Sequence, residues 1–224
     1  MALTVVSGNV AITQDQRTLS WTIPTLAVGD VVVVAAVTWD QANTLNPPSG
    51  TGLTFTQRLA ANAASHTRVY IWTAVASSAG SSVVVTCSVL AASNSIHNGT
   101  LYVCPTADGY SLAATPNTAT STTGSSASLS GASGNLGIVA VGDWSGGSGA
   151  SRAWLASAVE DMYQFSSTDS TQYGAHCDLT GATTSVGLST PTGASFTTGA
   201  IEILKSGGGG PALPPILVQP PRRF

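Results

Sequence analysis

Charged residues are scarce in this chain. Asp, Glu, Lys and Arg together make up 8% of the sequence, against about 25% in a typical soluble domain. Ser, Thr, Ala and Gly stand in their place, and a surface of this kind suits a protein that packs against neighbours. The net charge is −3, and the seven Lys and Arg are dispersed except at the C-terminal end. The composition therefore gives no indication of a nucleic-acid partner.

Cysteine and histidine are also rare, with three residues of each. Cys87, Cys104 and Cys177 fit no metal-ligand spacing, and each falls in a β-like segment, so we expect small buried hydrophobic side chains. A Cys87–Cys104 disulfide requires that their strands be neighbours. The three histidines are His66, His97 and His176. Because no two of them are spaced i,i+2 or i,i+4, a metal site or a catalytic role for them is not indicated.

Long apolar runs and helical periodicity are absent as well. The most apolar stretch, residues 31–37, is far shorter than the ~18 residues of a membrane span. No segment repeats its apolar residues every 3.6 positions over a dozen residues, and no Gly-x-Ser-x-Gly motif stands between a strand and a helix. Residues 1–7 lack the basic and apolar regions of a secretory signal. We expect synthesis in the host cytoplasm, no membrane partner, no enzymatic activity, no cofactor and no metal.

What the chain has is a pair of similar apolar strands. Residues 31–37 are rich in valine, follow a Gly-Asp turn and are followed by Trp39 and Asp40. This pattern predicts a strand buried on both faces. Residues 134–144 repeat the order with a Gly-Asn turn, an apolar run and the pair Asp143 and Trp144. We expect the two segments to be the central strands of one core.

Other strand-like segments recur at an offset of about one hundred residues. The expected pairs are residues 53–59 with 153–159, 68–75 with 172–179, 81–90 with 185–189, and 99–104 with 196–204. They predict an all-β fold, an antiparallel two-sheet β-sandwich that is jelly-roll-like and internally duplicated. One domain over residues 1–206 is preferred because the connection around Leu129 is itself strand-like. Two tandem small domains also fit the repeat.

The last eighteen residues differ from the rest of the chain. Residues 207–210 form a glycine linker, and residues 211–224 form a proline-rich segment whose prolines favour an extended polyproline II conformation. Such a segment loses little entropy on docking, so we predict an extended peptide that binds a partner. Its predicted anchors are Leu213, Ile216, Leu217, Val218, Arg222, Arg223 and Phe224.

A second candidate site lies at the ends of the two central strands. Trp39, Asp40, Asp143 and Trp144 together offer aromatic faces and carboxylates of the kind that bind sugars. Asp at a strand end more often caps a turn, and Trp in an apolar strand is more often a core residue. Glu160 and Asp161 are expected at strand ends too. The glycan site is therefore the alternative to the docking peptide.

Four groups of segments carry a resemblance to a known family. They are residues 23–39, residues 52–56, residues 69–72 with Ala79 and Gly80, and residues 134–144. Their order resembles a jelly-roll-like β-sandwich domain of virion proteins of tailed phages, particularly those of actinobacteria, and of some bacterial surface proteins. The resemblance spans roughly residues 17–205. It implies capsid decoration or a minor tail protein, and it carries no functional residues to transfer.

Together these observations predict a non-enzymatic virion structural protein on the capsid or tail surface. We expect it to be present in multiple copies or as a homo-oligomer, and to bind other virion proteins through its C-terminal peptide. The alternative is a carbohydrate-binding or adhesin module that recognises host surface glycans.

Overall fold

The computed structural model describes residues 2–7, 18–39, 44–62, 67–88, 97–145, 148–165, 170–193 and 195–206. In these ranges the chain is all-β, and the only helical element among them is the short 3₁₀ turn η1 (Thr106–Asp108). The strands are β1 (Thr4–Ser7), β2 (Thr18–Leu26), β3 (Val31–Thr38), β4 (Ser49–Gly50), β5 (Leu53–Thr54), β6 (Thr56–Asn62), β7 (Arg68–Val75), β8 (Gly80–Ser88), β9 (His97–Cys104), β10 (Tyr110–Ser111), β11 (Thr118–Ser121), β12 (Ser126–Leu129), β13 (Leu136–Asp143), β14 (Ala153–Trp154), β15 (Val159–Phe165), β16 (Thr171–Asp178), β17 (Thr184–Thr190) and β18 (Phe196–Lys205).

The strands of the two halves are arranged in the same order. In the first half one sheet runs β1-β9-β3-β7-β6 and the other β2-β8-β4-β5. In the second half β11-β18-β13-β16-β15 repeats the first order, and β10 also pairs with β18. The smaller sheet β12-β17-β14 matches β2-β8-β4, with no counterpart of β5 among the described residues. All pairs in the described residues are antiparallel. The prediction of an antiparallel, internally duplicated all-β sandwich is confirmed, and its jelly-roll detail stays a prediction.

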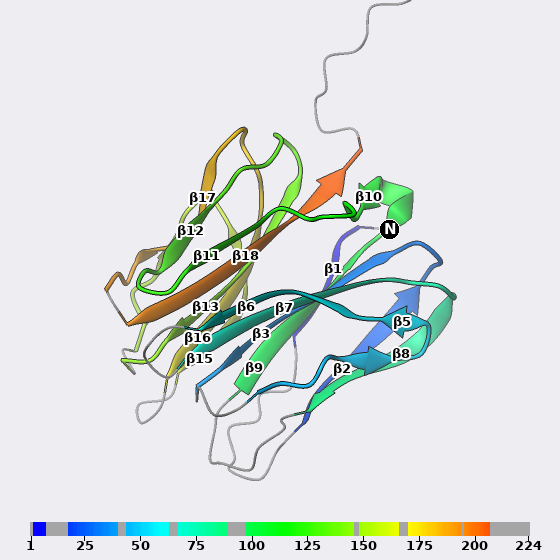
Figure 1. The fold of residues 1–224 in the computed structure, drawn as a ribbon, viewed down its shortest axis with the longest axis horizontal. Coiled ribbons are helices and arrows are strands. Elements are labelled where there is room, and N and C mark those ends of the chain that lie inside the picture. The colour runs from blue at the N-terminus through cyan, green and yellow to red at the C-terminus, as the bar shows by residue number, and fades with distance from the viewer. Residues whose placement is uncertain are drawn as a thin grey trace, which may run out of the picture.

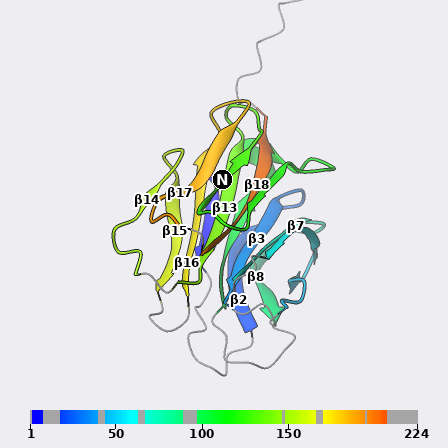
Figure 2. The same ribbon diagram turned by 60° about the vertical axis from the view of Figure 1, so that its left-hand side comes forward.

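The number of sheets differs from the expectation of two. The described residues form four sheets, because each half closes its own pair of sheets and the two larger sheets then pack on each other. Figure 2 shows the second half, with β14 and β17, on one side and the first half, with β3 and β7, on the other. β18 of the second half contacts β7 and β6 of the first, and Figure 1 shows β18 above these two strands.

The two central strands explain this packing. All eight residues of β3 and all eight of β13 are buried. Alternate side chains of a strand face opposite sides, so Val32 and Val34 enter the core of the first half while Val31 and Val33 face the second half. Ile138 on β13 meets them from the other side. We call this shared apolar layer between the halves the seam, and it confirms that β3 and β13 belong to one core.

One expected strand is two separate elements. Residues 153–159 were predicted as one strand, but β14 ends at Trp154 and β15 begins at Val159. Ala156 and Ser157 between them have φ values of 53° and 51°, a left-handed conformation that ends a strand. Glu160 and Asp161 therefore lie inside β15 and not at a strand end, which corrects the prediction.

The three cysteines are buried and free. Cys87 and Cys104 lie on β8 and β9, which belong to different sheets, so the condition for a disulfide is not met. All three thiols belong to the apolar clusters of the two halves and the seam. The expectation of small buried hydrophobic residues is confirmed. No helix among the described residues is long and apolar enough to cross a membrane.

Candidate functional site

The predicted glycan residues follow the two central strands, whose ends meet. A Cβ placed on Gly142 would lie only 2.8 Å from Cγ1 of Val37, so β3 and β13 end side by side. Trp39 follows the first and is partly buried, while Trp144 follows the second and is 37% exposed. The structure therefore brings both strand ends to one end of the molecule. Asp40 lies outside the described residues, as do all seven predicted anchors of the docking peptide.

Asp143 takes the turn-capping role. Its side chain is almost fully buried, and its Oδ1 accepts hydrogen bonds from the Ser145 backbone N–H at 2.9 Å and the Ser145 hydroxyl at 2.6 Å. This pattern closes the turn that follows β13. Of the predicted glycan residues, Trp144 thus offers the clearest contact surface for a ligand.

A cavity of about 330 Å³ lies next to this turn. Its hydroxyl-bearing lining is Ser145, Ser148, Ser151 and Thr192. Phe196 adds an apolar wall, and the Trp144 backbone N–H is held by the Ser195 carbonyl at 3.1 Å. Hydroxyls beside an aromatic face are the donor and acceptor set that suits a polyol.

The loop on one side of this cavity is held by an ion pair. Arg152 donates two hydrogen bonds to the carboxylate of Glu160, both at 2.5 Å, and its guanidinium lies 3.7 Å from the ring centre of Tyr163. Trp154 Nε1 donates to the same carboxylate at 3.0 Å. The hydrogen bonds from Arg152 lower the pKa of Glu160. Glu160 therefore holds the loop, with its carboxylate committed to groups of its own chain.

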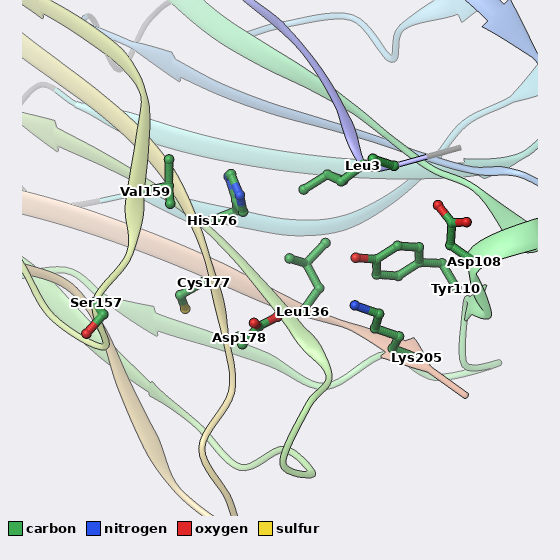
Figure 3. A pocket seen from close by; sticks show the side chains of 11 residues that line it. Leu3, Asp108, Tyr110, Leu136, Ser157, Val159, His176, Cys177, Asp178 and Lys205 are labelled. Atoms are coloured by element: carbon green, nitrogen blue, oxygen red, sulfur yellow. The ribbon is translucent and has the colours of Figure 1, made fainter. Parts of the chain in front are cut away.

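A larger cavity, of about 500 Å³, lies at the opposite end of β13. We call it the seam cavity. One side of it is formed by Leu3, which precedes β1, and by Asp108 and Tyr110, which connect the two halves. Its apolar lining includes Leu3, Leu136 and Val159. Figure 3 shows Leu136 and Leu3 in the middle, with His176 on one side and Tyr110 on the other.

Charged groups surround the apolar part of the seam cavity. Asp108 comes from η1, Asp178 from the end of β16 and Lys205 from the end of β18. The Lys205 ammonium lies 5.1 Å from the ring centre of Tyr110, within the range of a cation–π contact. Figure 3 shows Lys205 and Tyr110 side by side.

His176 joins the seam cavity to a buried cluster. The Tyr102 hydroxyl donates to Asp161 Oδ2 at 3.0 Å, and His176 Nδ1 lies 2.8 Å from the same oxygen. Tyr102 is on β9 of the first half, whereas Asp161 and His176 are on β15 and β16 of the second. Burial, with the Asp161 carboxylate, raises the pKa of Tyr102 well above its ordinary value. The cluster therefore ties the two halves together at the seam.

Sequence reasoning named Asp161 and His176 but did not pair them. They lie fifteen residues apart, and the pairing follows only from the antiparallel register of β15 on β16. That register shifts between Glu160 and Met162, which makes Asp161 the extra residue of a bulge. Arg58 holds the same position in β6 of the first half. The internal repeat was the signal that could have revealed β15.

Comparisons with protein-family models, curated proteins and solved structures find no match to this chain.

Proposed function

We propose that this chain is a non-enzymatic structural protein of a tailed-phage virion, exposed on the capsid or tail and attached through its C-terminal peptide. The resemblance of its segment order to virion sandwich domains supports this proposal. The low charge of the chain and its proline-rich tail support it as well.

The observation that carries the proposal is the use of acidic side chains to hold the scaffold. Asp30 accepts hydrogen bonds from the backbone N–H groups of Ala27 at 2.8 Å and Thr106 at 3.0 Å. Glu202 accepts from the Ala132 backbone N–H at 3.0 Å and from the side chain of Asn135 at 2.6 Å.

Asp143 and Glu160 are committed in the same way to a turn and a loop. Hydrogen bonds to these carboxylates stabilise turns and connections, which makes the folded domain more rigid. A rigid scaffold of this kind is what an assembly subunit needs.

The test is deletion of residues 213–224 in a phage that encodes the chain. We expect the truncated protein to be missing from purified particles while its melting temperature is unchanged, because every described strand ends before the deletion. Particle composition is measured by gel and mass spectrometry. Normal incorporation of the truncated protein would show that the peptide is not the attachment.

A charge-matched pair of variants sharpens this test. Arg222→Ala with Arg223→Ala removes two positive charges from the peptide, whereas Arg17→Ala with Arg58→Ala removes two from the rest of the chain. We expect only the first pair to lower incorporation at equal amounts of folded protein. Equal losses from both pairs would point to a general charge effect.

A carbohydrate-binding module is the second candidate function. Exposed Trp144 favours it, since its chain neighbours Asp143 and Ser145 line the hydroxyl-bearing cavity. If this function holds, Trp144→Ala weakens glycan binding about tenfold or more, since an aromatic face supplies much of the contact energy. Binding is measured on a glycan array and then by calorimetry. Val75→Ala is the control, because Val75 is 48% exposed and pairs with Val31 at the opposite end of β3. Equal glycan binding by the unsubstituted chain and both variants would exclude the site at Trp144.

A further inference from the structure

We propose that the seam cavity binds residues 222–224 of a second copy of this chain. The inference rests on the proposed function, in which the C-terminal peptide docks, and it names the partner of that peptide. The occupant is the Arg-Arg-Phe end of the peptide, and the receptor is the set of carboxylates and apolar side chains around Leu136.

The peptide leaves the folded body beside the seam cavity. Lys205 is the last residue of β18 and lines the cavity. Ser206 follows it and is held by the Gly109 carbonyl, which accepts from the Ser206 backbone N–H at 2.8 Å and from its hydroxyl at 3.0 Å. The starting point of the peptide is therefore fixed next to the cavity of its own chain.

The length and stiffness of the peptide favour the cavity of another copy. The segment from Pro211 to Arg222 contains five prolines, and a polyproline II segment of this length spans roughly 35 Å at about 3.1 Å per residue. The four glycines before it can redirect this segment, and the prolines within it oppose a tight reversal. Since the peptide starts beside its own cavity, a stiff segment of this reach favours docking of its arginines on a neighbouring copy.

The charges of the cavity complement those of the peptide end. Asp108 and Asp178 line it. The one lysine of the lining, Lys205, is placed over Tyr110. Carboxylates thus outnumber the fixed positive charge, and a guanidinium is the cation that binds a carboxylate with two parallel hydrogen bonds.

The apolar floor of the cavity suits the residue that follows the arginines. Leu3, Leu136 and Val159 offer an apolar surface between the charged groups, and Phe224 is the aromatic residue next to Arg223. A cavity of about 500 Å³ has the size of a site for a small ligand, so it accepts a few side chains. The rest of the peptide then bridges the two molecules.

Docking of this kind is heterologous, because the peptide of one copy meets the cavity of the next. Such contacts make rings when the rotation closes and filaments when it does not. Heterologous docking agrees with a protein that is present in many copies on a particle.

The test is sedimentation velocity of the full chain over a range of concentrations. We expect self-association that weakens about tenfold or more in Asp108→Asn with Asp178→Asn, and equally in Arg222→Ala with Arg223→Ala, because each pair removes two charged partners. Asp178→Asn alone is the second variant, since Asp178 is exposed and its replacement leaves the fold intact. High salt is expected to weaken the association as well.

Mixing the two double variants distinguishes docking between copies from other association. The aspartate double variant keeps an intact peptide but lacks the cavity charges. The arginine double variant keeps an intact cavity but lacks the peptide charges, so only the mixture contains both halves of the contact. We expect dimers in the mixture and monomers in each variant alone. Monomers of the full chain at every soluble concentration would overturn the inference, as would association that neither double variant weakens.

Sedimentation and particle composition together distinguish failure of this inference from failure of the proposed function. If the full chain stays monomeric but deletion of residues 213–224 still removes it from particles, the peptide docks on another virion protein and only this inference fails. If the deletion leaves incorporation normal while the full chain associates as expected, the proposed attachment fails and this inference stands.

Discussion

Replacement of Ile138 by aspartate is expected to unfold both halves of the protein. Ile138 is fully buried in the seam, where side chains of β3 surround it from the opposite sheet. An unpaired carboxylate in such a place costs several kcal/mol, and effects above about 4 kcal/mol are rare among single substitutions. A domain has only about 5–15 kcal/mol of stability in total. Circular dichroism and calorimetry of the purified variant measure the loss.

The matched control is Val84→Asp. Val84 is 51% exposed on β8, and a surface substitution of this kind changes stability by about 0.5 kcal/mol or less. We expect the unsubstituted chain to unfold in a single transition, because the two halves share the seam. If the Ile138 variant kept one half folded, with a separate transition, the halves would be independent domains and the tandem arrangement would hold.

Stability is expected to fall steeply above pH 9. Burial raises the pKa of the Cys87 thiol to about 12, and burial with the nearby Asp30 carboxylate raises the pKa of Cys104 to about 12. Burial raises the pKa of Cys177 to about 11. The ordinary value is 9.0, so between that pH and the raised values the unfolded chain loses these protons while the folded chain keeps them.

The sign of the effect follows from this difference in proton binding. A raised folded-state pKa contributes stability that is complete below pH 9.0 and is lost as the pH rises through the folded value. Cys87 and Cys104 each contribute about 1 kcal/mol per pH unit in this window. The raised pKa of Tyr102 extends the loss to higher pH. Urea unfolding under reducing conditions, from neutral pH to pH 11, measures the slope.

A cysteine variant separates this titration from other effects of alkali. Cys87→Ala removes one of the titrating thiols and leaves a small cavity, so we expect lower stability at neutral pH together with a shallower decline above pH 9. The two stability curves should therefore converge as the pH rises. Parallel curves for the variant and the unsubstituted chain would show that the thiol does not titrate between the folded and unfolded states.

Much of the fold was predictable from local pattern. The valine-rich residues 31–37 and the apolar residues after Gly134 were assigned as strands buried on both faces, and β3 and β13 are such strands. Their apolar character is a property of consecutive residues, and so it is visible in the sequence. The repeat likewise predicted the second-half strands β16, β17 and β18. Among the strands not predicted are the short β4, β10 and β11 and the longer β15. In β15, Glu160 and Asp161 carry charges that the strand pattern does not anticipate.

The candidate sites were less predictable, because contacts between distant residues define them. Trp39 and Trp144 were recognised as a pair from the repeat. The burial of Asp143 and its commitment to Ser145 follow only from the turn geometry. The seam cavity draws on five strands, η1 and the segment before β1, and no spacing in the sequence marks these residues as neighbours.

The sequence by itself determined the class of fold and the duplication. These follow from strand-length apolar runs and their recurrence at a fixed offset. Only the tertiary structure decided that the described residues form four sheets and that the three cysteines are free. It also decided that Asp161 joins Tyr102 to His176, and that a cavity opens beside Lys205. The reason is physical. A strand that is apolar on both faces must be covered on both sides, but its own sequence does not specify which partner covers each side.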